Sequence, residues 1–181
     1  STDNCGIATY ALSRTSFTCA NVGANTVTLT VTDVKGNVST ANATVTVQDN
    51  INPTVLTQNI TVQLGANGTV TITPAQINNG SFDNCGIATY ALSRTSFTCA
   101  NTGANTVTLT VTDIYGNVGT NTAVVTVTDT TLPTIVAPIA INTTTNTGCT
   151  VTGLALGTPV TSDNCTVASV TNNAPVVFPL G

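Results

Sequence analysis

Apolar and polar residues alternate along several short stretches of the chain. The clearest is NTVTLTVTD at Asn105–Asp113, where threonines line one face and three apolar side chains line the other: Val107, Leu109 and Val111. A period of two predicts a half-buried β-strand. Turn residues follow in DIYGN at Asp113–Asn117, and a second alternating run begins at Ala123. We therefore expect a β-hairpin here.

Similar runs upstream predict strands at Asn59–Leu64, Gly68–Thr73 and Gly86–Ser93. Thr and Val are abundant, and both are β-branched residues that favour strands. The chain has no Glu and only one Lys, two residues on which helix-rich proteins rely. The sequence therefore predicts an all-β fold.

The chain repeats itself with a fixed period. The nineteen letters DNCGIATYALSRTSFTCAN at Asp3–Asn21 return unchanged at Asp83–Asn101, and DNC occurs a third time at Asp163. The match continues to Val38 and Val118 with three differences: Val22/Thr102, Val34/Ile114 and Lys35/Tyr115. A period of about 80 residues suits a tandem array of small immunoglobulin-like β-sandwiches.

An Asp-x-x-x-Pro segment ends each strand-rich stretch, and Pro does not continue a central strand. We place the boundaries after Asp49 and Asp129. Residues 1–49 (the first copy) are then the later part of a repeat, 50–129 (the middle copy) a complete repeat, and 130–181 (the last copy) the earlier part of a divergent repeat. We expect the chain to be a window on a longer protein.

Composition excludes several classes of function. Only 6% of residues are charged, the net charge is −4, and there is no His. A protein this poor in Lys and Arg has no basic surface for nucleic acid. It also lacks the residue for His-based catalysis or a His-bearing zinc site, and no apolar run reaches the roughly 20 residues of a membrane helix. We expect no enzyme activity, no nucleic-acid partner and no membrane insertion.

The six cysteines occur two per copy. The simplest pairing keeps each disulfide within a copy: Cys5–Cys19, Cys85–Cys99 and Cys149–Cys165. A metal site would need more ligands than two Cys without His. Disulfides imply an oxidising location outside the cytoplasm.

The seven acids are all Asp and fall at only three phases of the repeat. If the first strand of a copy runs away from its N-terminal end, the loop with Asp83 and the turn at Asp113 return to that end, where the linker with Asp49 also lies. An oxygen-rich cluster of this kind suits Ca²⁺. The alternatives are turns that begin at Asp33 and Asp113, Asx turns at the Asp-Asn-Cys sequences, and solvated linker acids at Asp49 and Asp129. The candidate ligands, with nearby Asn carbonyls, are Asp3, Asp33, Asp49, Asp83, Asp113, Asp129, Asp163, Asn50, Asn52, Asn84 and Asn117.

The combined pattern resembles the hyalin repeat (HYR), an immunoglobulin-like β-sandwich module. It consists of Asp-x-x-x-Pro, a Thr/Val strand, DNCG, GANTVTLTVTD-x-x-GN and a final Thr/Val strand. The wording FTCANVGANTVTLTVTDVKGNV is similar to tandem copies in very large surface proteins of Bacteroidota, including gliding-motility adhesins of the SprB type. The last copy departs from the pattern in its cysteines.

The resemblance implies type IX secretion, display on the outer-membrane surface of a Gram-negative cell, and an adhesive or stalk role. We expect a structural spacer whose partners are neighbouring repeats. The alternative is a module that binds a surface glycan or another cell-surface protein through exposed tyrosines. DTT at Asp129–Thr131 also resembles the Asp-Thr-x O-glycosylation signal of Bacteroidota, which makes Thr130 a candidate acceptor.

Overall fold

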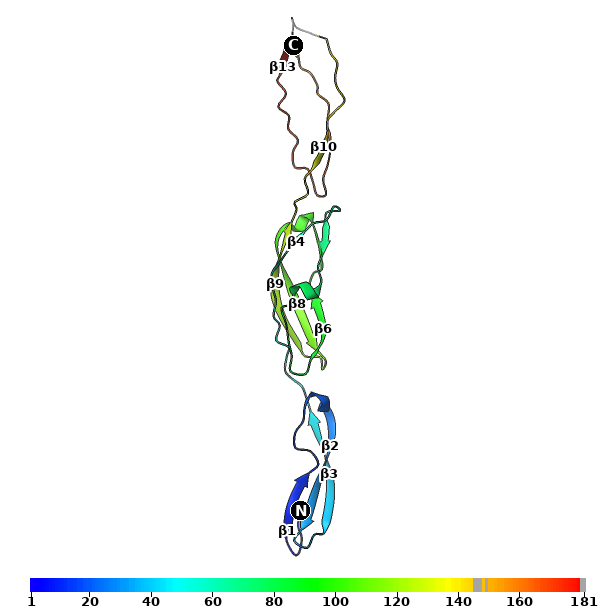
Figure 1. The fold of residues 1–181 in the computed structure, drawn as a ribbon, viewed down its shortest axis with the longest axis vertical. Coiled ribbons are helices and arrows are strands. Elements are labelled where there is room, and N and C mark those ends of the chain that lie inside the picture. Colours follow the sequence, from blue (N-terminus) through cyan, green and yellow to red (C-terminus); the bar gives the residue numbers. More distant parts are fainter. Residues whose placement is uncertain (145–147, 149, 180–181) are drawn as a thin grey trace. The chain divides into compact units, whose positions relative to one another are not determined.

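A computed structural model of the chain describes residues 1–144, 148 and 150–179. Regular structure in these residues is almost entirely β, so the prediction of an all-β sandwich fold is confirmed (Figure 1). The helical segments are one four-residue helix, α1 (Pro74–Ile77), and two short 3-10 turns, η1 (Cys19–Asn21) and η2 (Cys99–Asn101). None of the described helices has the length and hydropathy needed to span a membrane.

The strands follow the repeat. The first copy contains β1 (Ile7–Leu12), β2 (Gly23–Asp33) and β3 (Val38–Val47). The middle copy contains β4 (Ile60–Gln63), β5 (Thr69–Thr71), β6 (Ile87–Leu92), β7 (Ser96–Thr98), β8 (Gly103–Asp113) and β9 (Val118–Thr128). The last copy contains β10 (Thr134–Val136), β11 (Thr150–Thr152), β12 (Val160–Ser162) and β13 (Val177–Pro179).

Strand pairing is mostly antiparallel. The first copy forms a sheet in the order β1-β2-β3, and the middle copy forms one in the order β4-β9-β8-β6, with β4 parallel to β9. Three two-stranded sheets complete the described structure: β5-β7, β10-β12 and β11-β13. The expected hairpin is β8 and β9, joined by the turn after Asp113.

Contacts divide the chain into two compact units, each built from several segments. Unit 1 comprises Ser1–Gln58, Pro74–Ser93 and Val107–Ala123. Unit 2 comprises Asn59–Thr73, Arg94–Thr106 and Val124–Gly181. The boundaries of these units differ from those of the sequence copies, whose limits after Asp49 and Asp129 remain predictions.

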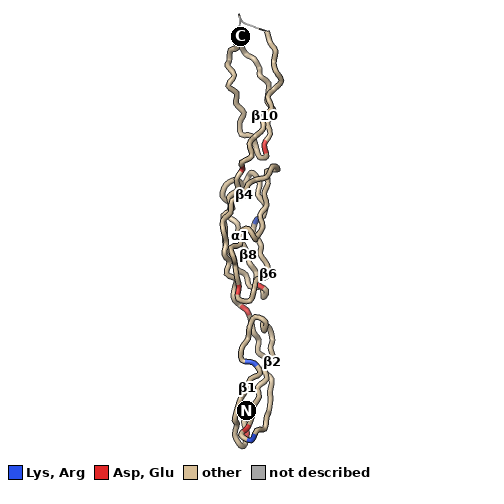
Figure 2. Tube along the Cα trace, in the orientation of Figure 1, with Lys and Arg blue, Asp and Glu red and all other residues tan. Residues whose placement is uncertain are grey.

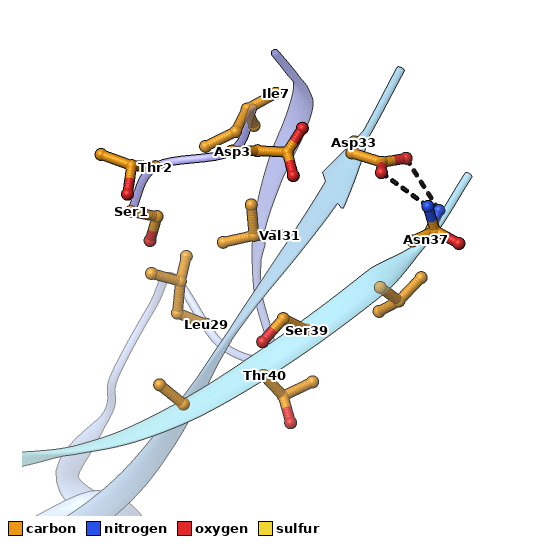
Figure 3. Close-up of a pocket in the computed structure, with 12 residues that line it drawn as sticks. Ser1, Thr2, Asp3, Ile7, Leu29, Val31, Asp33, Asn37, Ser39 and Thr40 are labelled. Atoms are coloured by element: carbon orange, nitrogen blue, oxygen red, sulfur yellow. Dashed lines mark hydrogen bonds between the residues drawn. The ribbon is translucent and has the colours of Figure 1, made fainter. Parts of the chain in front are cut away.

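One strand sequence is buried to different extents in its two copies. In β8 the alternating apolar side chains are fully buried: Val107, Leu109 and Val111. In β2 only Val27 is buried, and the counterparts Leu29 and Val31 are half-buried and line an open pocket of about 370 Å³ (Figure 3). Alternation therefore sets which face is apolar, and the neighbouring segments set how far it is buried.

Gly119 in β9 is one point where a segment approaches too closely for a side chain. A Cβ added there would lie 2.3 Å from the Pro53 carbonyl oxygen and 2.9 Å from Val55 Cγ2. Pro53 and Val55 are both buried, so the backbone at Pro53 has little room to withdraw. The first copy carries Ser39 at the same phase, and that side chain is exposed.

We expect Gly119→Ala to lower the free energy of unfolding by roughly 1–3 kcal/mol, because overpacking forces the Pro53 segment away from β9. Urea unfolding measures the change. Ser39→Ala is the matched control and should alter stability by less than about 0.5 kcal/mol. Equal stability of Gly119→Ala and the unsubstituted chain would contradict the close approach.

Candidate functional site

Three carboxylates from separate parts of the sequence meet in unit 1. Asp49 follows β3, Asp83 precedes β6 and Asp113 ends β8. One oxygen of each carboxylate lies within 4.8 Å of the corresponding oxygens of the other two. We call this group the carboxylate cluster. The three phases of the repeat that carry every acid are therefore brought to one place.

Two carboxylates of the cluster are held by their own turns. Asp113 Oδ1 accepts hydrogen bonds from the backbone N–H groups of Tyr115 and Asn117, both at 2.8 Å. Asp83 Oδ2 accepts from the N–H of Cys85 at 2.8 Å and of Gly86 at 3.2 Å. The expected Asx-type turns are therefore present, and they use only part of each carboxylate's capacity to accept hydrogen bonds.

The remaining oxygens give the cluster its chemical character. Asp49 Oδ2 and Asp83 Oδ1 are buried from solvent and have no hydrogen-bond partner, while Asp113 is only 2% exposed. No Lys or Arg of the described residues forms an ion pair with the cluster, and Figure 2 shows how few basic residues the chain has. Buried carboxylate oxygens without partners are costly, and a hard divalent cation would satisfy them.

The asparagines near the cluster present N–H groups where carbonyl oxygens were expected. Asn117 Nδ2 donates to Asp113 Oδ2 at 2.6 Å and to the Asp49 carbonyl at 3.2 Å. Asn84 Nδ2 donates to Asp49 Oδ1 at 3.4 Å. Asn50 and Asn52 are exposed, and within the described residues no hydrogen bond joins their amides to the cluster. The amides thus orient the carboxylates and add no ligand oxygen in this arrangement.

A second group in unit 2 reproduces part of the cluster one period later. Asp129 Oδ1 accepts from Asn164 Nδ2 at 3.1 Å, as Asp49 does from Asn84. Asp163 Oδ1 and Asn164 Oδ1 are buried without a hydrogen-bond partner. Asn164 was not among the predicted ligands, although it stands at the phase of Asn84.

The first copy holds a carboxylate pair, Asp3 and Asp33, beside the open pocket (Figure 3). Asp33 accepts from the side chain and the backbone N–H of Asn37 at 2.7 and 2.8 Å. Asp3 Oδ2 accepts from the Cys5 N–H at 2.8 Å. The described residues contain no counterpart of Asp49 at this pair.

Hydrogen bonding lowers the pKa of two of the turn carboxylates. For Asp113, burial opposes ionisation, but the side-chain amide and backbone N–H of Asn117 and the N–H of Tyr115 outweigh it and lower the pKa. The Asn37 amide, followed by the Asn37 backbone N–H, lowers the pKa of Asp33. Both side chains are therefore charged at neutral pH.

The disulfides join consecutive copies, so the predicted pairing within copies is wrong. Cys19 is bonded to Cys85, and Cys99 to Cys165. Both bridges span 66 positions. Cys5 is free and exposed, so it is not bonded to Cys19. Cys149 lies outside the described residues, and its expected partner Cys165 is bonded to Cys99.

Local turns hold the bonded cysteines in position. The Thr-Cys-Ala-Asn sequence forms the capped turns η1 and η2, in which Asn21 and Asn101 accept from the backbone N–H of the Thr that opens each turn at 3.0 Å. The Asp-Asn-Cys turn positions the receiving cysteine through the bond from the Cys85 N–H to Asp83. The bridged Cα atoms lie 5.3 and 5.6 Å apart, which is ordinary disulfide spacing.

Tyr115 adds a polar link to the first bridge. Its hydroxyl donates to the Cys19 carbonyl at 2.5 Å, across 96 positions of sequence. The first copy has Lys35 at this phase. The contact therefore depends on one of the three differences between the two long matching segments.

The Thr130 hydroxyl and the two arginine side chains each contact one other side chain. Thr130 is exposed, and its hydroxyl accepts a hydrogen bond from the Gln63 amide, so the candidate glycosylation site is accessible but engaged. Arg14 lies 5.9 Å from the ring centroid of Phe17, and Arg94 lies 5.7 Å from that of Phe97. Within the described residues neither arginine forms an ion pair.

Sequence comparisons assign no family: no protein-family model matches the chain, and no curated protein matches it significantly. Among solved structures, the chain is similar to the extracellular cadherin domains 1–4 of protocadherin gamma B7, with a TM-score of 0.38 and 11% sequence identity. That alignment covers 96% of this chain and 57% of the protocadherin chain. At this level of similarity, the all-β assignment depends on the strands themselves.

The lowered pKa of Asp113 predicts a pH-dependent contribution to stability. A depressed carboxyl pKa stabilises the fold above the ordinary value of about 4, and the contribution is lost as pH falls through the folded-state pKa. We expect Asn117→Ala to destabilise the chain at pH 7 more than at pH 3. Urea unfolding at both pH values measures this. Asn121→Ala is the control, because its amide donates to the uncharged Val55 carbonyl, and its effect should not depend on pH.

Peptide mapping under non-reducing conditions tests the bridges directly. We expect one linked pair containing Cys19 and Cys85 and another containing Cys99 and Cys165. Replacing both Cys19 and Cys85 with Ser should lower the free energy of unfolding by about 4 kcal/mol in the chain-entropy account of a closed loop this long. Recovery of Cys85 linked to Cys99 would overturn this arrangement and restore pairing within a copy.

Proposed function

We propose that this chain is a spacer segment of a secreted cell-surface adhesin, in which consecutive repeats are joined by disulfides and stiffened by Ca²⁺ at their borders. The observation that carries the proposal is the pair of bridges between copies, Cys19–Cys85 and Cys99–Cys165, which occur at one phase of the repeat. A bond that recurs with the period links each copy to the next, as a spacer requires.

Near-identity of the copies supports a mechanical role. The nineteen identical residues and the matching strands β2 and β8 make one unit available many times, so that length scales with copy number. We propose no catalytic role. The chain lacks His and Glu, and every acid falls at a recurring phase.

The proposed location combines the bridges with the sequence resemblance. Disulfides persist in oxidising compartments, which supports an extracellular site. The resemblance to hyalin repeats of Bacteroidota surface proteins supports type IX secretion and attachment at the outer membrane. Gliding motility and surface attachment are the processes that such an adhesin serves.

A calcium site accounts for the carboxylate cluster better than turn residues or solvated linker acids do. Ca²⁺ takes oxygen ligands from several carboxylates, and Asp49 and Asp83 each offer a buried oxygen without a partner. The equivalent group at Asp129 and Asp163 offers another such oxygen, so a buried carboxylate oxygen without a partner recurs with the period. One Ca²⁺ bound to the cluster would offset two of the three negative charges that the three separate segments bring together.

A glycan- or protein-binding role has one observation in its favour. Tyr10 on β1 and Tyr90 on β6 occupy the same phase and are 61% and 39% exposed. Repeated exposed aromatic side chains can stack on sugars or anchor a partner protein. We rank this role second, because each tyrosine is the single aromatic residue of its strand and is flanked there by Thr and Ala.

Thermal unfolding of the full chain in EDTA and in millimolar Ca²⁺, with small-angle scattering, tests the cation. A cation present at 100 times its Kd adds about 2.7 kcal/mol, so we expect a clear rise in Tm. Asp83→Asn combined with Asp163→Asn should abolish that rise, because each of the two groups then loses a carboxylate. Asp3→Asn, at the same phase in the first copy, should preserve it.

An unchanged Tm in calcium would remove the cation from the proposal and leave the aspartates as turn residues. Calcium dependence that survives the double variant would place the ion elsewhere. Binding of a glycan array through Tyr10 and Tyr90, lost on Ala substitution, would favour the second role.

A further inference from the structure

The two bridges define a short covalent route through the chain. A route that enters at Ser1 reaches Cys19, crosses to Cys85, continues to Cys99 and crosses to Cys165. Residues 20–84 and 100–164 lie in two closed loops beside this route. Between the bridges only the segment from Cys85 to Cys99 remains on it.

We propose that this route, here called the tension path, carries pulling force along the array and limits its extension whether or not the copies stay folded. The inference deepens the proposed spacer function and rests on it. Each period contributes one bridge and the fourteen steps from Cys85 to Cys99 to the tension path. The closed loops add nothing to the length at full stretch.

The bridges greatly reduce the length to which one period can be stretched. At about 3.5 Å per extended residue, an unbridged period would stretch to roughly 280 Å. The bridged period reaches only about 55 Å, counting fourteen steps and one disulfide. While the bridges hold, unfolding therefore cannot stretch a period beyond about 55 Å.

The repeated sequence and the tension path coincide. The identical segment Asp83–Asn101 contains the turn that positions Cys85, the path itself and the turn that positions Cys99. The path is also structured, since β6 pairs with β8 and β7 pairs with β5. The last copy diverges elsewhere but keeps Asp163-Asn164-Cys165, the part that receives a bridge.

The carboxylates of the cluster lie off the tension path. Asp49 and Asp83 belong to the loop closed by Cys19–Cys85, and Asp113 belongs to the loop closed by Cys99–Cys165. Once the bridges are taut, force along the covalent chain bypasses these loops. The strands β2, β3, β8 and β9 are protected in the same way and stay in closed loops from which they can refold.

Single-molecule pulling on the full chain tests the tension path. Handles are joined by peptide ligation at Ser1 and Gly181, so that no cysteine is used. From the extended length per residue, we expect a stretched contour of about 180 Å for the oxidised chain. After treatment with a phosphine we expect a contour of about 630 Å. Each bridge takes two electrons from the phosphine, which becomes the phosphine oxide with oxygen from water, and the water protons complete the two thiols.

Variants separate the two bridges. Cys19→Ser with Cys85→Ser should lengthen the oxidised chain by about 230 Å, the extended length of the loop that it opens. Cys99→Ser with Cys165→Ser should do the same. Cys5→Ser is the matched control and should change nothing. Contour length depends on covalent connectivity, so a variant that folds poorly still gives a reading, and peptide mapping of the same sample identifies any exchanged bridge.

An oxidised contour of about 480 Å would overturn the proposal, because bridges within copies remove only about fourteen to sixteen steps each. Equal contours before and after reduction would overturn it as well. Either result would also remove the bridges between copies from the proposed spacer function, while its calcium test would stand unchanged. The expected contours together with an unchanged Tm in calcium would support the tension path and remove the cation, so the two failures remain distinguishable.

Discussion

The structure depends on covalent closure between consecutive copies. Each bridge spans 66 positions and fastens a capped Thr-Cys-Ala-Asn turn to an Asp-Asn-Cys turn of the following copy. The covalent bonds therefore cross the predicted borders between copies. The carboxylate cluster, the Tyr115 hydroxyl and the Asn117 amide are arranged around the first of these borders.

The carboxylate cluster and the bridges act on different terms in the free energy. A disulfide chiefly restricts the unfolded chain, so its effect persists whatever the solvent contains. A cation acts by mass action on the folded state, and its contribution follows the free ion concentration. The bridges fix how the copies are connected, and the cation that we propose would make the stability of the border depend on the free ion concentration.

Strands and the convergence of acids could be predicted from the sequence, because both follow from local periodicity. Alternation in NTVTLTVTD set the apolar face of β8, and strand parity brought Asp49, Asp83 and Asp113 together. The disulfide partners could not be predicted, because one and the same series of cysteine positions allows pairing within a copy and pairing across a border. Amide orientation at Asn84 and Asn117 was also beyond reach, since it depends on which carboxylate oxygens the turns have already used.

The span of the bridges has a genetic consequence. The stretch that each bridge closes and the stretch from Cys85 to Cys99 together complete one period. Unequal recombination between near-identical copies adds or removes whole periods, and every such event leaves each Asp-Asn-Cys turn facing a Thr-Cys-Ala-Asn turn. Copy number can then vary without creating a further unpaired thiol, whereas an insertion of a partial period breaks the series. Recombination can therefore change the length of the array without changing its disulfide pairing.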